Sequence, residues 1–256
     1  MSGITLYHAL FSTCSQKVRF VLAYKGLIYE SRLINLAAGE HLQDWYLAIN
    51  PNGVVPAIEH DGNAIFDSSV IAEYLDECFG DYPLAPADTI GRARMRAWMR
   101  YFEEVPTAAI RVPSFNKLFA RSIAAKGDDA NAAQRERMPL RKHFYAKMTA
   151  DGFDQAATLE AEDQLRSCVA RVETALEKGG PFLLGSSISL ADIALLPSIV
   201  RMDDLGMAEF WLANGKLADW YAAMQAQPAF VGAYAAGARV DPNIWKSVDS
   251  KAGSFN

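Results

Sequence analysis

The chain has 256 residues, of which 51% are hydrophobic, and a formal net charge of −5 at pH 7. This much apolar material excludes an intrinsically disordered chain and is enough for one large domain or two small ones. The mildly acidic balance argues against a nucleic-acid partner, because nucleic-acid-binding proteins need a concentrated basic surface.

Short strand and helix signals alternate over the first 80 residues. The strands are expected at 4–10, 28–36, 54–59 and 63–67, and the helices at 15–25, 40–49 and 68–79. The sequence HDGN between the last two strands is a hairpin turn signal. This order of elements predicts a small α/β domain.

A proline-rich segment, GDYPLAPAD, follows and is typical of a linker. We expect one domain at 1–80, a linker at 81–88 and a second domain at 89–256. Beyond the linker the strand signals vanish and the pattern is helical, which predicts an all-α domain. Helices are expected at 90–119, with breaks near Pro106 and Pro113, and at 158–177, 189–202, 216–225 and 228–237. Residues 120–153 are charged and irregular, and Ser189 with Asp192 forms a capping-box-like helix start.

Cysteine usage and the N-terminus favour a cytoplasmic location. Cys14, Cys78 and Cys168 are odd in number and widely spaced, so they match neither a disulfide framework nor a zinc pattern. The start MSGITLYHAL lacks the basic segment and long apolar run of a signal peptide. No apolar run reaches the roughly 20 residues of a membrane span. We therefore expect no membrane contact, and the histidine spacing gives no reason to expect a metal.

Pro56, in NPNGVVPAIEHDG, interrupts an otherwise strand-like run. A proline removes one hydrogen bond from a sheet, so one interpretation is an edge strand. The other is a cis bond between Val55 and Pro56, in a turn that exposes the Val55 N–H and C=O. Such a turn would bind an extended peptide by strand addition.

Four motifs in order, STCSQKVR, NPNGVVPAI, DSSVIAEYL and SLADI, resemble the cytosolic glutathione transferase family over essentially the whole chain. The resemblance implies a thioredoxin-like N-terminal domain, an all-helical C-terminal domain, glutathione as cosubstrate and usually a homodimer. It also implies that Val54, Val55 and Pro56 contact glutathione.

The remaining glutathione contacts are expected at Asp67, Ser68 and His41. A helix starts at FDSSVI, and a helix N-terminus attracts carboxylate, although Asp67 and Ser68 also fit an ordinary N-cap. The resemblance implies that Asp67 takes the ammonium of glutathione and that Ser68 donates to the neighbouring carboxylate. The family usually has Glu-Ser at these positions. His41 matches a position that grips the glycine carboxylate, but it also fits a solvated helix residue.

Three side chains between the first strand and helix are candidates for activating the thiol. Ser12 ranks first because it matches the catalytic serine of several classes of the family. Its hydroxyl would donate to the glutathione sulfur and, with the helix N-terminus, favour the thiolate. Cys14 matches the cysteine of the bacterial beta class but also fits a small packing residue. Ser15 fits a cap, although related bacterial ether-cleaving members carry a serine at the matching place.

The second domain is expected to supply a pocket for a hydrophobic, aromatic electrophile. Tyr101, Phe115, Met202 and Trp211 are candidates for its lining, although such residues at helical spacing are also typical of a core.

The length of the second domain bears on the electrophile. Residues 116–153 look like an insertion. Together with the segments RMDDLG and PAFVGAYAAG, this insertion makes the chain similar to the bacterial β-etherase branch of the family. Enzymes of that branch cleave aryl ethers of lignin-derived dimers. One alternative is a zeta-like isomerase of the maleylacetoacetate type, but the extra residues of the second domain argue against it. The other is a non-catalytic binding protein, against which the retention of Ser12, Pro56 and the Asp67-Ser68 pair counts.

Overall fold

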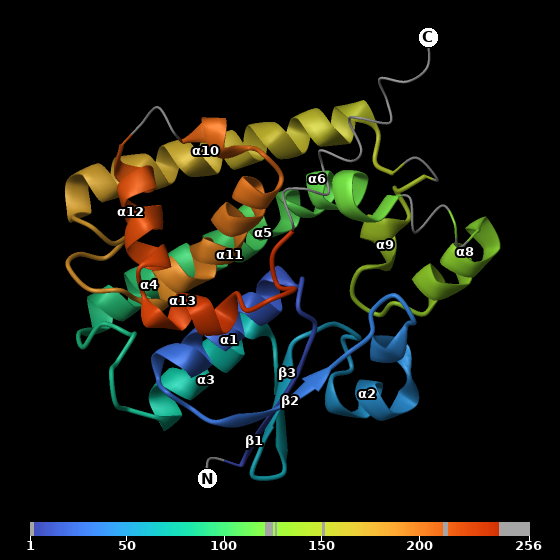
Figure 1. Cartoon of the computed structure of the whole chain (residues 1–256), viewed down its shortest axis with the longest axis horizontal. Coiled ribbons are helices and arrows are strands. Elements are labelled where there is room, and N and C mark those ends of the chain that lie inside the picture. Colours follow the sequence, from blue (N-terminus) through green and yellow to red (C-terminus); the bar gives the residue numbers. More distant parts are fainter. Residues whose placement is uncertain (1–2, 121–124, 126, 150–151, 212–214, 241–256) are drawn as a thin grey trace.

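The computed structural model describes residues 3–120, 125, 127–149, 152–211 and 215–240, with the backbone alone for 128–130. Its N-terminal part contains a four-stranded sheet of order β2-β1-β3-β4 (Figure 1). The strands are β1 (Ile4–His8), β2 (Tyr29–Leu33), β3 (Ala57–His60) and β4 (Asn63–Phe66). Strand β1 runs parallel to β2 and antiparallel to β3, and β3 and β4 form the expected hairpin.

Helices cover both faces of this sheet. They are α1 (Thr13–Tyr24), η1 (Glu40–Leu42), α2 (Asp44–Ile49) and α3 (Ser68–Cys78). Side chains alternate across a strand, so Leu6 and Ile58 face α1 and α3 in the main core, whereas Tyr7 and Ala57 join a smaller cluster with Tyr46 of α2. The α/β domain expected from the sequence is therefore confirmed.

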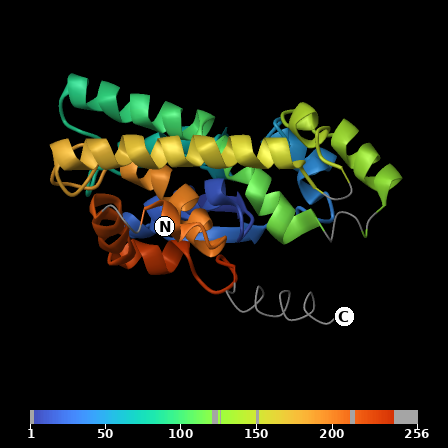
Figure 2. The same cartoon turned by 90° about the horizontal axis from the view of Figure 1, so that it is seen from above.

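The rest of the described chain is helical, as predicted. Its elements are α4 (Thr89–Glu104), α5 (Pro106–Ala109), α6 (Arg111–Ser114), the π-helical turn η2 (Phe115–Phe119), α8 (Asp128–Glu136), α9 (Lys142–Tyr145), α10 (Gln155–Gly179), α11 (Leu190–Asp204), η3 (Ala208–Phe210), α12 (Lys216–Gln225) and α13 (Pro228–Ala233). Helix α10 spans most of the molecule, and α8 and α9 gather at one end of it, on the side of α2 (Figure 2). The segment 120–153, expected to be irregular, contains these two short helices.

The expected break in the helical run 90–119 occurs before Pro106. Val105 leaves the helical region with φ −100° and ψ −80°, and Pro106 is the first residue of α5. Pro113 lies within the first turn of α6, where no intrahelical N–H bond is required. The chain therefore passes Pro113 in helical form and continues into the π-helical turn.

One apolar core joins the sheet domain to the helical domain. Helix α1 packs against α3 on its own side and against α11 and α13 of the helical part. Val18 and Leu22 of α1 belong to the same buried cluster as Leu195 of α11 and Ala233 of α13. The large apolar interface holds the two domains in a fixed relation. In the described part of the chain, no helix is both long enough and apolar enough to cross a membrane.

The buried carboxylate of Asp192 fixes the start of α11. It accepts hydrogen bonds from the Ser189 N–H at 2.9 Å, the Ser189 hydroxyl at 2.7 Å, the Leu183 N–H at 2.9 Å and the Trp220 indole N–H at 2.9 Å. The capping box expected from the sequence is therefore present, and it also ties the preceding loop and α12 to α11.

We expect Asp192→Ala to lower the free energy of unfolding by about 3–5 kcal/mol, because it leaves several buried donors without an acceptor. Asp154→Ala is the matched control, since the exposed Asp154 caps α10 through one bond to the Ala157 N–H. Its expected cost is about 1 kcal/mol. Urea denaturation of both variants measures the difference, and equal costs would contradict the role given to Asp192.

Candidate functional site

Three residues at the start of α1 border a cavity. Ser12 is the N-cap, with φ −71° and ψ 119°, and its Oγ accepts from the Ser15 N–H at 3.2 Å. Ser15 is fully buried, and its own Oγ accepts from the Ala9 N–H at 3.4 Å. Ser15 therefore holds the turn between β1 and α1, whereas Ser12, Thr13 and Cys14 line the cavity.

The Val55–Pro56 peptide bond is cis, as one of the two sequence interpretations expected. The preceding carbonyl, that of Val54, accepts from the Tyr46 hydroxyl and from the Asn50 side-chain amide, both at 2.7 Å. Among the residues that the structure describes, neither the N–H nor the C=O of Val55 forms a hydrogen bond. The turn therefore presents unused main-chain groups of Val55 beside the cavity.

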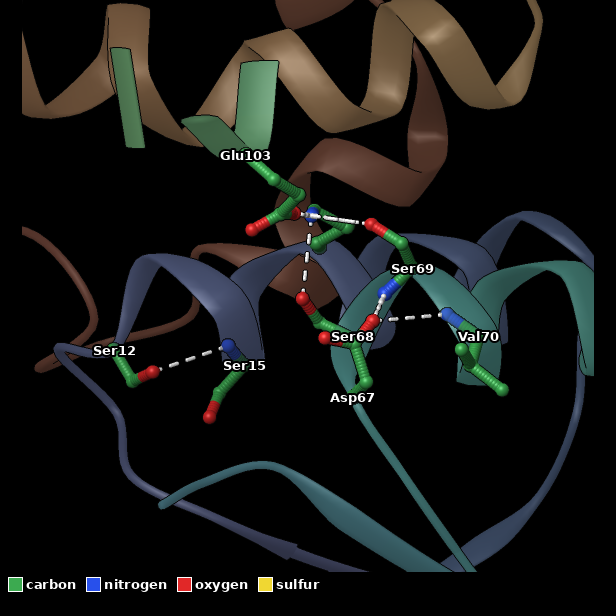
Figure 3. A network of polar contacts seen from close by, with 8 residues as sticks. Ser12, Ser15, Asp67, Ser68, Ser69, Val70 and Glu103 are labelled. Carbon is green, nitrogen blue, oxygen red and sulfur yellow. Dashed lines mark hydrogen bonds and ion pairs between the residues drawn. The ribbon is translucent and has the colours of Figure 1, made fainter. Parts of the chain in front are cut away.

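The start of α3 lies across from the start of α1 (Figure 3). Asp67 caps α3 in the left-handed region at φ 73°, and its Oδ1 accepts from the N–H groups of Ser69 at 2.9 Å and Val70 at 3.2 Å. A non-glycine residue with positive φ is uncommon and tends to occur at functional sites. The cap fixes the direction of the Asp67 carboxylate.

A buried ion pair connects α1, α3 and α4. The Lys17 ammonium pairs with Glu103 and donates to the hydroxyls of Ser68 and Ser69, both at 3.2 Å. Ser69 in turn donates to Glu103 at 3.0 Å. Burial opposes the charged forms of both ions, but their mutual attraction outweighs it, raising the pKa of Lys17 and lowering the pKa of Glu103. The ordinary protonation states are therefore stabilised, with the Lys17 side chain buried and the Glu103 side chain partly exposed.

The cavity has a volume of about 360 Å³ and lies between two walls. The sheet domain supplies one wall, made of Phe11, Ser12, Thr13, Cys14, Leu36, Ala37, His41, Asn52, Gly53, Val54 and Val55. The helical domain supplies the other, made of Ile110, Arg111, Ser114, Phe115, Phe119, Asn131, Gln134, Arg135, Met138, Arg141, Tyr145, Met148 and Arg201. One side of the cavity thus offers main chain and small polar groups, and the other offers aromatic rings, methionines and arginines.

The structure brings six of the thirteen expected site residues to the lining of this cavity. Lining it are Ser12, Cys14, His41, Val54, Val55 and Phe115. Pro56 and Ser15 are buried behind the wall, and Asp67 and Ser68 lie at the start of α3, outside the cavity lining but joined to α1 through Lys17.

Tyr101, Met202 and Trp211 do not line the cavity, which differs from the sequence expectation. Met202 and Trp211 are 1% and 2% exposed and belong to the core. Tyr101 lies under the guanidinium of Arg171, 4.0 Å from its ring centre. Helix α11 is buried on nearly all sides, so residue type and spacing there do not distinguish core from pocket.

Sequence reasoning missed several residues of the site. Arg111, Arg141 and Tyr145 line the helical wall, and Glu103 completes the ion pair with Lys17. A signal existed for Tyr145 and Arg141, since both lie in the 116–153 segment that looked like an insertion. Nothing in the local pattern of α4 distinguished Glu103 from its solvated neighbours.

Comparisons with known proteins identify the family. The model of the glutathione S-transferase N-terminal domain matches residues 11–78, and that of the C-terminal domain matches residues 132–223. Protein LigF of Sphingobium sp. strain SYK-6 is 32% identical over 184 residues, covering 70% of this chain and 71% of LigF. The chain belongs to the glutathione S-transferase family. Members of this family use glutathione as cosubstrate.

Two further comparisons bear on the transferase's chemistry. The crystal structure of the beta-etherase LigF superposes with a TM-score of 0.80 at 27% identity, covering 91% of this chain and 98% of that one. The maleylacetoacetate isomerase of Pseudomonas aeruginosa is 46% identical over 94 residues, which are 36% of this transferase and 44% of the isomerase.

We expect Glu103→Gln to lower the free energy of unfolding by about 3 kcal/mol, because it leaves the buried Lys17 charge without its counter-ion. The matched control is Glu73→Gln, whose carboxylate is similarly exposed (25% against 26%) but pairs with the exposed Arg96. That variant should lose less than about 1 kcal/mol.

The stability lost in Glu103→Gln should also depend on pH. Folding lowers the pKa of Glu103 below its ordinary 4.5, so the stabilisation is present above that pH and is lost as the pH falls through the folded-state pKa. Chemical denaturation between pH 3 and 7 should therefore show a smaller stability difference between the parent protein and Glu103→Gln at the acidic end. A difference that stays constant over this range would contradict the assignment.

Proposed function

We propose that this transferase binds glutathione along the wall supplied by the sheet domain and directs its thiolate at an electrophile held by the helical wall. The observation that carries the proposal is the pair formed by the cis turn and the start of α1: unused main-chain groups of Val55 and the cap residue Ser12 border one cavity. An extended tripeptide can add to the turn as a strand adds to a sheet edge, which brings its central cysteine towards α1.

We assign the γ-glutamyl end and the glycine end of glutathione to two polar sites. The γ-glutamyl end meets Asp67 and Ser68 at the start of α3, where helix N–H groups and the Lys17 ammonium favour a carboxylate. The Asp67 carboxylate, fixed by its capping bonds, takes the ammonium group. The glycine end meets His41, which is 7% exposed and lines the cavity.

We assign the activation of the glutathione thiol to Ser12. Its Oγ already accepts a bond from the Ser15 N–H, so its hydroxyl proton is left to be donated to the sulfur. A hydrogen bond of this kind and the positive end of α1 both stabilise the thiolate over the thiol. Lowering a thiol pKa by about two units corresponds to roughly 2–3 kcal/mol. Cys14 remains the alternative, since its side chain also lines the cavity, and Ser15 ranks behind both because its hydroxyl is used within the turn.

We expect Ser12→Ala to raise the pKa of bound glutathione by roughly 1–2 units and to lower kcat/KM roughly 10- to 100-fold, because one charge-assisted hydrogen bond is lost. Thiolate absorbance titration and steady-state kinetics measure the two effects. Cys14→Ala should leave both nearly unchanged, and the reverse pattern would transfer the role to Cys14.

For the electrophile, we propose a β-aryl ether ketone of the kind released from lignin. The thiolate attacks the carbon beside the ketone, a C–S bond forms, the C–O bond breaks, and the phenoxide leaves and is protonated to a phenol, with no change in overall oxidation level. Support comes from the similarity to the beta-etherase LigF. Phe115 and Tyr145, whose ring centres are 5.2 Å apart at the helical wall, offer stacking surface for an aryl group. Positioning of the two reactants supplies much of the rate gain.

The test is an incubation of the protein with a β-aryl ether ketone, with and without glutathione, followed by chromatographic detection of the released phenol. We expect release only when glutathione is present. Turnover of a chloro-dinitroaromatic compound without any release from the ether would instead identify a general transferase.

A zeta-like isomerase is the second candidate, favoured by the 46% identity to maleylacetoacetate isomerase over 94 residues. Isomerisation of maleylacetoacetate without consumption of glutathione would identify it. A non-catalytic role would show as glutathione binding by calorimetry without turnover of any of these substrates. A homodimer and a cytoplasmic location also stay predictions, which light scattering and cell fractionation would test.

A further inference from the structure

The cavity is strongly asymmetric in charge. Four arginines line it, Arg111, Arg135, Arg141 and Arg201, and no aspartate or glutamate is found among the described residues of its lining. All four come from the helical domain. Among the residues that the structure describes, none of the four takes part in an ion pair.

Two of these arginines have other tasks. Arg201 is buried and donates to the Phe11 carbonyl at 2.6 Å and to the Ser114 hydroxyl at 3.4 Å, so it holds the loop before Ser12 in place. Arg135 belongs to α8, which is joined to the sheet domain by a bond of 2.7 Å from Arg137 to the Leu42 carbonyl, next to His41. Arg135 and His41 line the same cavity, so we assign Arg135 to the glycine end of glutathione. This leaves Arg111 and Arg141 for the second reactant.

Arg111 is held in an unfavourable setting for a cation. Burial and the neighbouring positive charge of Arg141 both lower the pKa of its guanidinium. Its contacts at the wall are weak, with the guanidinium 6.0 Å from the ring centre of Phe144. Glu103 also attracts Arg111, but that carboxylate is already bound by Lys17 and Ser69. Two like charges facing one cavity are stabilised when an anion lies between them.

An anion bound by Arg111 would share the cavity with the start of α1 and with the aromatic rings of the helical wall. Arg111 lines the cavity together with Cys14 of the sheet wall and Tyr145 of the helical wall. Guanidinium groups bind carboxylates through two parallel hydrogen bonds, which fixes both the position and the plane of the group. An arene carrying a carboxylate would therefore be held by its ring at Phe115 and Tyr145 and by its charge at Arg111.

We propose that the electrophile of this transferase is an aromatic compound bearing a carboxylate, which Arg111 and Arg141 bind at the helical wall. The inference rests on the proposed function, because it needs glutathione to occupy the opposite wall. It narrows the substrate class from neutral arenes to aryl acids. Under the ether-cleavage proposal, such a carboxylate would sit on one of the two aryl rings of the dimer.

The experiment uses unreactive probes, so it does not depend on turnover. Calorimetry of the glutathione-saturated protein compares 3,5-dinitrobenzoate with the neutral 3,5-dinitrobenzamide, which has nearly the same shape and no leaving group. We expect the carboxylate to bind about tenfold more tightly or better, as for hydrogen bonds to a charged group. Equal affinities would overturn the proposal.

Variants test whether Arg111 causes the preference for the carboxylate. Arg111→Gln should reduce the affinity ratio, that of the dinitrobenzoate to that of the dinitrobenzamide, to near one while leaving the dissociation constant of glutathione within about twofold. Arg111→Lys should keep part of this ratio because it keeps the charge. Arg100→Gln is the control, since Arg100 is exposed on α4 and outside the cavity lining. Thermal melting checks folding, which should be preserved because the variant removes a like-charge repulsion.

Two outcomes separate this inference from the proposed function. If Arg111→Gln weakens glutathione binding and leaves the affinity ratio unchanged, the arginine serves glutathione and the inference is wrong. If the parent protein binds no glutathione at all, the proposed function fails first, and calorimetry with glutathione alone reveals this before any probe is added.

Discussion

The ion pair between Lys17 and Glu103 is the interaction on which the site depends. It joins three helices that are distant in sequence, and it places the Ser68 and Ser69 hydroxyls at the start of α3 within reach of the same ammonium. A buried ion pair of this kind contributes little net stability when both partners are present, but it is costly to break. Its main effect here is to fix the positions of the starts of α1 and α3 relative to one another.

The second constraint is the anchoring of the turn before Pro56. Tyr46 and Asn50 both donate to the Val54 carbonyl, so that carbonyl is engaged within the protein, while the next residue, Val55, lines the cavity. The network at α3 and this turn use the same principle. In each, side chains satisfy one set of main-chain groups, which leaves the neighbouring set available to a ligand with its own donors and acceptors.

Much of the fold could be predicted from the sequence, because its signals are local. Alternating strand and helix patterns, the HDGN turn, Pro106 and the Ser189–Asp192 capping box each act within a few residues, and the structure has each of them. The cis bond at Pro56 was also open to sequence reasoning, since proline has strong positional preferences, whereas the cap that Ser15 was expected to fit is formed by Ser12.

The helical wall could not be predicted in the same way. Met202 of α11 and Trp211, which follows η3, looked like pocket residues, but both are buried in the core. Helix α11 is buried on nearly all sides, so no periodic pattern reveals which face meets a cavity. Arg111 and Arg141 are 30 positions apart and come together only because the chain returns after α8. Pairing of this kind depends on tertiary packing, which a single sequence does not encode in its local spacing.

The bond from Arg201 to the Phe11 carbonyl has a consequence for how molecules enter and leave. It crosses from the helical domain to the loop before Ser12, alongside the apolar core shared by α1, α11 and α13. This bond and the shared apolar core both oppose a hinge motion that would separate the two domains. A bulky molecule must therefore fit between the two walls of the cavity at the spacing that they already have.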